Sequence, residues 1–233
     1  MRDLRRAGAL LGALAFVWLL AGCGGSSSSS NGIASKSAEA ILQASKAAAA
    51  QAASVHIAGS IESADTPVSL DMELLAGKGG KGTISQDGFK IQLIQVGGSI
   101  YINGSAAFYK HVAGAAAAQL LQGRWLKAPA GSGELASLSS LTNLSRLVDT
   151  ALAGHGVLTK GSAATIEGQP AIALQDKSKG GTLYVATTGR PYPLEIAKAG
   201  SENGKVVLDR WDQPVTLKAP AGAIDISKLQ AGG

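Results

Sequence analysis

Aromatic residues and cysteine are scarce in this sequence. Phe, Trp and Tyr make up 4% of the 233 residues, and Cys23 is the one cysteine. A single thiol excludes a disulfide within the chain and a metal site built from cysteines. Few aromatic rings are available on which bases or sugars could stack. The formal net charge of +5 is a mild excess, so we expect no nucleic-acid partner.

Motifs of catalytic and metal sites are also missing. His56, His111 and His155 are not spaced as metal-ligand pairs, and each is expected to be a solvated surface residue. No serine lies in a Gly-x-Ser-x-Gly elbow. The glycines and lysines of Gly77–Gly82 lack the GxxxxGK[ST] order of a phosphate loop. We therefore expect a protein that is not an enzyme and that holds neither a cofactor nor a metal.

The N-terminal residues have the three parts of a bacterial lipoprotein signal peptide. The cationic segment Met1–Arg6 precedes an uncharged apolar run, Ala7–Leu20, which is too short to span a membrane. The run ends in Leu20-Ala21-Gly22-Cys23, which resembles a lipobox. We expect cleavage after residue 22 and a diacylglyceryl anchor, with chains such as palmitate, on Cys23. Export by the Sec route is favoured, although Arg5-Arg6 leaves twin-arginine export open.

The rest of the chain is expected to be a tether followed by one domain. Residues 23–34 are rich in Gly and Ser, which is typical of a flexible linker. Residues 35–233 are long and apolar enough to form a single domain with its own core. The anchor would hold this domain at the cell membrane, on the extracytoplasmic face.

Within the domain, the residue pattern predicts a helix, a meander of strands, a helical insertion and a second meander. Ser37 is the expected N-cap of an Ala-rich helix that runs to about Ala53. Alternating apolar and polar side chains then indicate half-buried antiparallel strands, with Gly77–Gly82 as a hairpin connection. The leucines from Leu135 to Leu147 are spaced as in an amphipathic helix. The predicted strands cover residues 55–62, 68–74, 89–93, 99–103, 165–174, 182–186, 194–197, 205–211 and 215–219.

An α+β fold follows, with a curved antiparallel sheet that is apolar on one face and covered by helices. This apolar face has two interpretations. If the helices pack tightly on it, the face is a solid core. If its small and flexible side chains leave space, an acyl chain could occupy that space. The residue pattern leaves both interpretations open.

Several segments resemble one family of lipoproteins over nearly the whole mature chain. The chain looks like the actinobacterial LppX/LprAFG lipoproteins, which are distant relatives of the gram-negative carrier LolA. The resemblance implies a half-barrel sheet with helices over its concave face, and a cavity that receives lipid acyl chains for transfer across the cell envelope. The segments that carry it are Ala53–Ile57, Gly98–Asn103, Gly123–Lys127, Pro193–Ile196 and Val206–Val215, together with the lipobox and the Ser-rich tether.

On this resemblance, the chain is expected to be a monomer that binds membrane lipids or an acylated glycolipid and works with an envelope transporter. The competing hypothesis is a protein-binding, sensor or regulatory lipoprotein with a solid core. Leu138, Leu141 and Leu144 are expected to form a movable cover over the cavity. The residues expected to line it are Ile57, Ile61, Leu70, Met72, Ile91, Leu93, Ile100, Ile102, Leu183, Val185 and Ile196.

Overall fold

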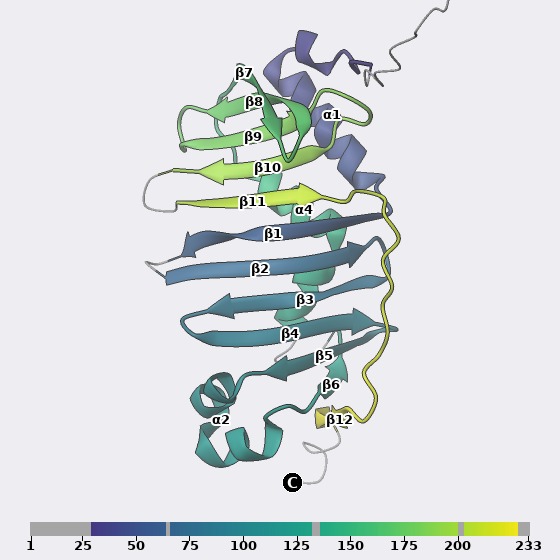
Figure 1. The fold of residues 1–233 in the computed structure, drawn as a ribbon, viewed down its shortest axis with the longest axis vertical. Helices are drawn as coiled ribbons and strands as arrows, with labels where there is room; N and C mark the ends of the chain where they lie inside the picture. The colour runs from purple at the N-terminus through teal and green to yellow at the C-terminus, as the bar shows by residue number, and fades with distance from the viewer. Residues whose placement is uncertain (1–28, 64–65, 132–135, 200–202, 228–233) are drawn as a thin grey trace, which may run out of the picture.

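The computed structural model describes residues 29–63, 66–131, 136–199 and 203–227. In these ranges twelve strands form one sheet, in the order β12-β6-β5-β4-β3-β2-β1-β11-β10-β9-β8-β7 (Figure 1). Neighbouring strands are antiparallel except for β12 and β6, which are parallel. The strands are β1 (Ser54–Ser63), β2 (Thr66–Leu75), β3 (Gly79–Gln86), β4 (Phe89–Val96), β5 (Ser99–Gly104), β6 (Leu126–Pro129), β7 (Leu158–Ile166), β8 (Gln169–Asp176), β9 (Gly181–Ala186), β10 (Pro193–Lys198), β11 (Gly204–Asp209) and β12 (Ile224–Asp225).

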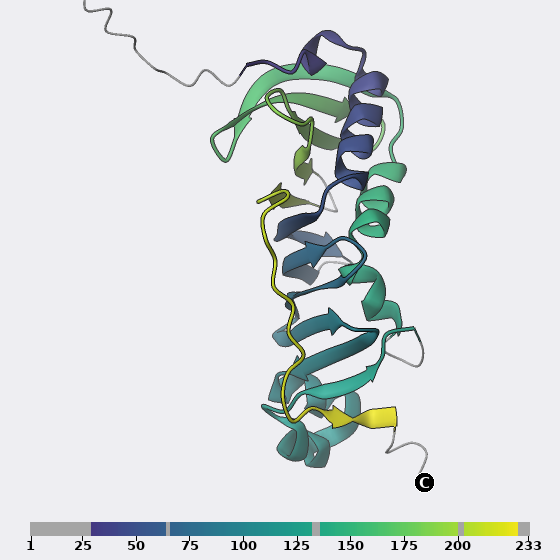
Figure 2. The same cartoon turned by 90° about the vertical axis from the view of Figure 1, so that its right-hand side faces the viewer.

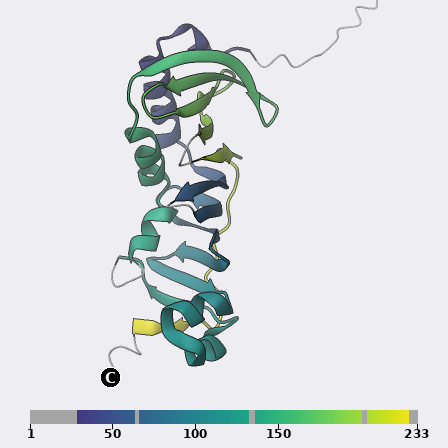
Figure 3. The ribbon, with the colours of Figure 1, turned by 90° about the vertical axis from the view of Figure 1, so that its left-hand side faces the viewer.

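The main helices lie on one side of this sheet. Figure 2 shows α1 and α4 along the same face, and Figure 3 shows α2 at the β5 end. Polar side chains cap the helices as expected, since Ser37, Ser105 and Asn143 each accept a hydrogen bond from a first-turn backbone N–H. The helical segments are η1 (Ile33–Ser35), α1 (Ala38–Ala50), α2 (Ala106–Leu121), α3 (Ala136–Ser139), η2 (Ser140–Thr142) and α4 (Leu144–Ala153).

The core lies between the helices and the concave face of the sheet. Strand register places Ile57 opposite Met72 on one side and Leu208 on the other, so apolar side chains form rows across the strands. Ile41 and Leu42 of α1 are buried in the same cluster. The predicted fold, a curved antiparallel sheet covered by helices on its concave face, is confirmed.

The hairpin connection predicted over Gly77–Gly82 is shorter in the structure. Residues 76–78 form the turn between β2 and β3, whereas Gly79–Gly82 belong to β3, which pairs with β2 and β4 along its length. A Cβ atom on Gly80 would lie 2.6 Å from Leu74 Cδ2, and one on Gly82 would lie 2.5 Å from Met72 Sδ. Glycine is needed here because both side chains and backbone of β2 lie too close to leave space for a Cβ atom.

The Leu-rich helix predicted over residues 135–148 is interrupted. Within the described part, α3 and η2 end at Thr142, and Asn143 adopts an extended conformation with φ −99° and ψ 103°. The Asn143 side chain accepts a hydrogen bond from Arg146 N at 3.0 Å, which starts α4 as a new helix. The leucine spacing continues across this break, so periodicity alone could not reveal it.

The strand predicted over residues 215–219 is also absent. Residues 210–223, here called the C-terminal strap, run in an extended path from β11 past the ends of the central strands to β12 (Figure 1). Figure 2 shows the strap on the side of the sheet opposite α1 and α4. Its alternation of residue types reflects contact with the sheet surface and not strand pairing.

The packed domain begins earlier than predicted, within the segment 23–34 that was expected to be a tether. Asn31 N donates to Thr187 O at 2.9 Å, and Asn31 Nδ2 donates to Ala186 O at 3.1 Å. Ile33 is buried in the core. The packed domain therefore begins by Ser30, which forms a bridge with Thr188. The signal peptide and Cys23 lie outside the described residues.

Candidate functional site

A cavity of about 690 Å³ separates part of the concave face from the helices. Its roof, here called the cover, consists of η2 and α4, and its floor comes from β1, β2, β10 and β11. Most of the wall is aliphatic. The floor residues are Ile57, Ile61, Glu62, Leu70, Ile196, Lys198, Gly204, Val206 and Leu208, and the cover residues are Ser140, Leu141, Arg146, Leu147, Val148, Thr150 and Ala151.

Two glycines lie in the strands that form the floor of the cavity. Gly59 of β1 lies opposite Leu70 and Val206, and Gly204 of β11 lies opposite Ile61. Neither glycine sends a side chain toward the cover, whereas neighbouring rows of the same face carry isoleucine, leucine or methionine. Glycine is needed at both positions because neighbouring backbone lies very close: a Cβ atom on Gly59 would be 2.1 Å from Lys205 O, and one on Gly204 would be 2.6 Å from Ser60 O.

The cover is held at both ends. Leu144, Val148 and Leu152 form the buried stripe of α4, with 2%, 4% and 5% of their surfaces exposed, and α4 packs against α1. Thr142 Oγ1 donates to Gln95 Oε1 of β4 at 2.6 Å, which attaches η2 to the sheet outside the floor strands. These contacts hold the cover against α1 and β4.

The cavity reaches solvent on one side. Ile61 keeps 41% of its surface exposed, and Glu62, Arg146, Thr150 and Ala151 are exposed as well. Gly204 pairs with both Ile61 and Lys198, so this side lies where β1 and β10 end and β11 begins. A ligand could therefore have an apolar part under the cover and a polar part at this exposed edge.

The structure brings only some of the predicted cavity residues to the cavity wall. Ile57, Ile61, Leu70 and Ile196 line it, and of the predicted cover residues Leu141 does. Leu144 is buried in the core and Leu138 is partly buried against it. Leu183 borders a second cavity of about 190 Å³ under α4. The others pack in or against the core and line neither of these two cavities: Met72, Ile91, Leu93, Ile100, Ile102 and Val185.

Sequence reasoning missed the contribution of β11 and the inner side of α4. Val206 and Leu208 line the floor, and Leu147, Val148 and Ala151 line the cover. Alternation within β11 and the leucine spacing of α4 were visible in the sequence. What was not visible was that β11 pairs with β1, which places it at the centre of the sheet.

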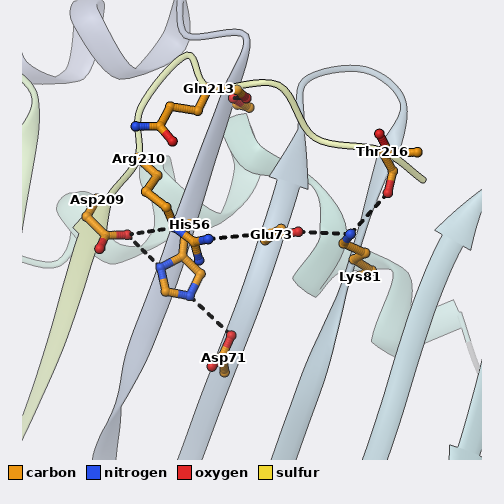
Figure 4. A network of polar contacts seen from close by, with 9 residues as sticks. His56, Asp71, Glu73, Lys81, Asp209, Arg210, Gln213 and Thr216 are labelled. Carbon is orange, nitrogen blue, oxygen red and sulfur yellow. Dashed lines mark hydrogen bonds and ion pairs between the residues drawn. The ribbon is translucent and has the colours of Figure 1, made fainter.

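The opposite, convex face carries a polar network around His56 (Figure 4). His56 Nδ1 lies 2.5 Å from Asp209 Oδ1, and Nε2 lies 3.1 Å from Asp71 Oδ1. The His56 side chain is only 14% exposed, so the expectation of a solvated surface histidine is wrong. Across the described ranges, no group of three or more His, Cys, Asp and Glu residues is arranged to hold a metal ion.

The same network attaches the C-terminal strap to the sheet. Glu73 forms ion pairs with Arg210 at 3.2 Å and with Lys81 at 3.0 Å. Lys81 Nζ also donates to the backbone carbonyl of Thr216 at 3.1 Å. These groups are partly exposed, and each such pair contributes little by itself. Together they link β1, β2, β3 and the strap (Figure 4).

Asp212 fixes the start of the strap. Its carboxylate accepts hydrogen bonds from Tyr192 Oη at 2.5 Å and from the backbone N–H of Ala53 at 2.7 Å, and these two contacts lower the pKa of Asp212. Desolvation raises the pKa of Tyr192, whose ring stacks on Trp211 at a centroid distance of 4.5 Å. The role of this cluster is structural.

Asp176 organises the turn after β8. Its carboxylate accepts hydrogen bonds from Gly156 N at 2.7 Å, from Ser178 Oγ at 2.7 Å, and from the backbone N–H groups of Ser178 and Lys179. The Gly156 contact is the largest of the effects that lower the pKa of Asp176 well below its usual range. This side chain joins the loop before β7 to the β8–β9 turn.

The fold and the cavity together define the class of protein: an open, curved antiparallel sheet with helices over its concave face and an apolar cavity between them. Among the described residues, no helix is both long and apolar enough to cross a membrane. No family model matches the sequence, and no curated protein matches it.

Two mycobacterial proteins of known structure have the same fold. LprF from Mycobacterium bovis is 16% identical, with a TM-score of 0.50 over 79% of this chain and 97% of LprF. The lipoprotein LppX from Mycobacterium tuberculosis is 17% identical, with a TM-score of 0.51 over 78% of this chain and 98% of LppX. The likeness establishes the LppX-type fold that the sequence segments predicted.

Proposed function

We propose that this chain is an extracytoplasmic, membrane-anchored lipoprotein that binds acyl chains in its cavity and carries lipids or lipidated molecules across the cell envelope. The observation that carries the proposal is the cavity of about 690 Å³ with a mainly aliphatic wall. Its volume is in the range of ~300–1,000 Å³ that is usual for small-molecule sites. The protein would perform no covalent chemistry on its cargo.

Removal of acyl chains from water would drive capture. A chain of about 16 carbons contributes on the order of 10 kcal/mol at ~0.8 kcal/mol per buried CH₂, before the cost of immobilising it. Such binding depends mainly on chain length and weakly on chain identity. An anchor on Cys23 would keep the cavity close to the bilayer, at a high effective concentration of lipid.

The competing hypothesis, a protein-binding or regulatory lipoprotein with a solid core, receives less support. A solid core requires the cover to pack directly on β1 and β11. In this structure a cavity of about 690 Å³ lies between the cover and these strands. A cavity with an exposed edge favours a small apolar ligand over a protein partner.

Native mass spectrometry with lipid extraction would test the proposal. The chain from residue 23 onward, with Cys23→Ser so that it has no anchor of its own, would be purified from an actinobacterial host. We expect lipid to co-purify in a defined molar ratio. A lipid-free mass, together with no uptake of added lipids by the folded chain, would refute the proposal.

A further inference from the structure

We propose that the lipid bound in the cavity has a negatively charged headgroup and that Arg146 binds it at the exposed edge. This inference rests on the proposed function, because it names the class of lipid that the same cavity takes. The acyl chains would lie against the aliphatic floor. The headgroup phosphate would face the guanidinium, which can donate two parallel hydrogen bonds to it.

Arg146 lines the apolar cavity, and no acidic group pairs with its charge. It lies on α4 beside Leu147 and Val148, which line the same cavity, and it is exposed. Its guanidinium makes no hydrogen bond or ion pair in the described part of the chain, and its backbone N–H donates to Asn143 Oδ1. Its five donors are therefore available to a ligand.

The acidic residues of α4 and of the cavity wall do not neutralise Arg146. Asp149 follows three residues later on α4, and Glu62 lines the cavity from β1. Neither forms an ion pair with Arg146. Lys198 of β10 lines the cavity as well.

Helix stability does not explain an arginine at this position. α4 begins at Leu144, so Arg146 lies in the first turn, which contains no acidic residue. The first turn is the positive end of the helix dipole, where a cation is disfavoured. A cation placed there, exposed and without an ion pair, fits a binding role better than a structural one.

The test compares two lipids that differ only in their phosphate. The chain from residue 23 onward with Cys23→Ser would be incubated with equal amounts of phosphatidic acid and diacylglycerol of the same acyl chains, in non-ionic detergent micelles. The protein would be re-isolated and its bound lipids quantified by mass spectrometry. We expect the wild-type cavity to prefer phosphatidic acid by about ten-fold or more. The preference should fall as salt is raised, since the headgroup lies at an exposed edge.

Variants of the cavity wall test whether Arg146 causes the preference for phosphatidic acid. We expect Arg146→Gln to reduce the preference to near unity, and Arg146→Lys to restore part of it. Glu62→Gln should increase the preference, because it removes the one carboxylate of the cavity wall. Arg124→Gln is the matched control, since Arg124 is exposed and lines neither cavity.

The outcomes separate this inference from the proposed function. Uptake of neither lipid by the folded chain would refute the carrier function itself. Equal uptake of both lipids by the wild-type chain would overturn the headgroup assignment and leave the carrier function standing. A preference that Arg146→Gln leaves unchanged would also overturn the assignment.

Discussion

A tryptophan at position 151 should block the cavity without unfolding the protein. Ala151 lines the cavity from α4 and is exposed, whereas the adjacent Leu152 is buried in the core. The indole can therefore enter the cavity from its exposed edge without displacing a core side chain. If it excludes about four methylene groups of the ligand at ~0.8 kcal/mol each, affinity falls by ~3 kcal/mol, or more than ~100-fold.

A fluorescent fatty acid whose emission increases in an apolar site would measure this loss. Titration of the Ala151→Trp chain should give a binding curve shifted by about two decades relative to the wild-type chain. Ala153→Trp is the matched control, because Ala153 is exposed on the same helix and does not line the cavity. The thermal unfolding midpoints of both variants should stay close to wild type. Equal binding by the Ala151→Trp and Ala153→Trp chains would show that the ligand lies elsewhere.

Three further predictions concern the floor, the core and the turn after β8. Leu70→Asp should abolish fatty-acid uptake in a chain whose circular dichroism is unchanged, because it places a charge in the cavity floor. Ile100→Ala should lower the free energy of unfolding by about 2–5 kcal/mol in urea titrations, with lipid binding retained, since Ile100 is fully buried and does not line the cavity. Because folding lowers the pKa of Asp176, its stabilising effect is present above the pKa of the unfolded state, near 4, and is lost as the pH falls below it. Asp176→Asn should therefore lower the unfolding midpoint at pH 7 and have less effect at pH 3, and an equal loss at both values would contradict this account.

The convex face and the cavity have separate roles in this structure. The strap is attached by side chains from β1, β2 and β3, at positions that alternate with those of the cavity floor. In β1, for example, His56 faces the network whereas Ile57 faces the cavity. Because neighbouring strand residues face opposite sides, one short segment contributes both to the attachment of the strap and to the cavity floor.

The sequence by itself determined those features that depend on local chemistry. Alternation in residues 55–62 and 68–74 identified β1 and β2 and the face that each buries, because side chains in a strand alternate between faces. Ser37 marked the start of α1, because a serine side chain caps a free backbone N–H. The lipobox ending in Cys23 indicated an anchor, a prediction that concerns residues outside the described ranges.

Only the tertiary structure decided where the cavity lies and what surrounds it. β1 pairs with β11, which is about 150 residues later in the chain, and this register brings Val206 into the same cross-strand row as Leu70, with Gly59 between them. Met72 and Ile100 have the same apolar character as Leu70, yet they are buried in the core and do not line the cavity. Composition could not separate them, because the difference depends on which part of the sheet η2 and α4 leave open. The position of these helices is set by long-range contacts such as Thr142 to Gln95, and local sequence carries no record of them.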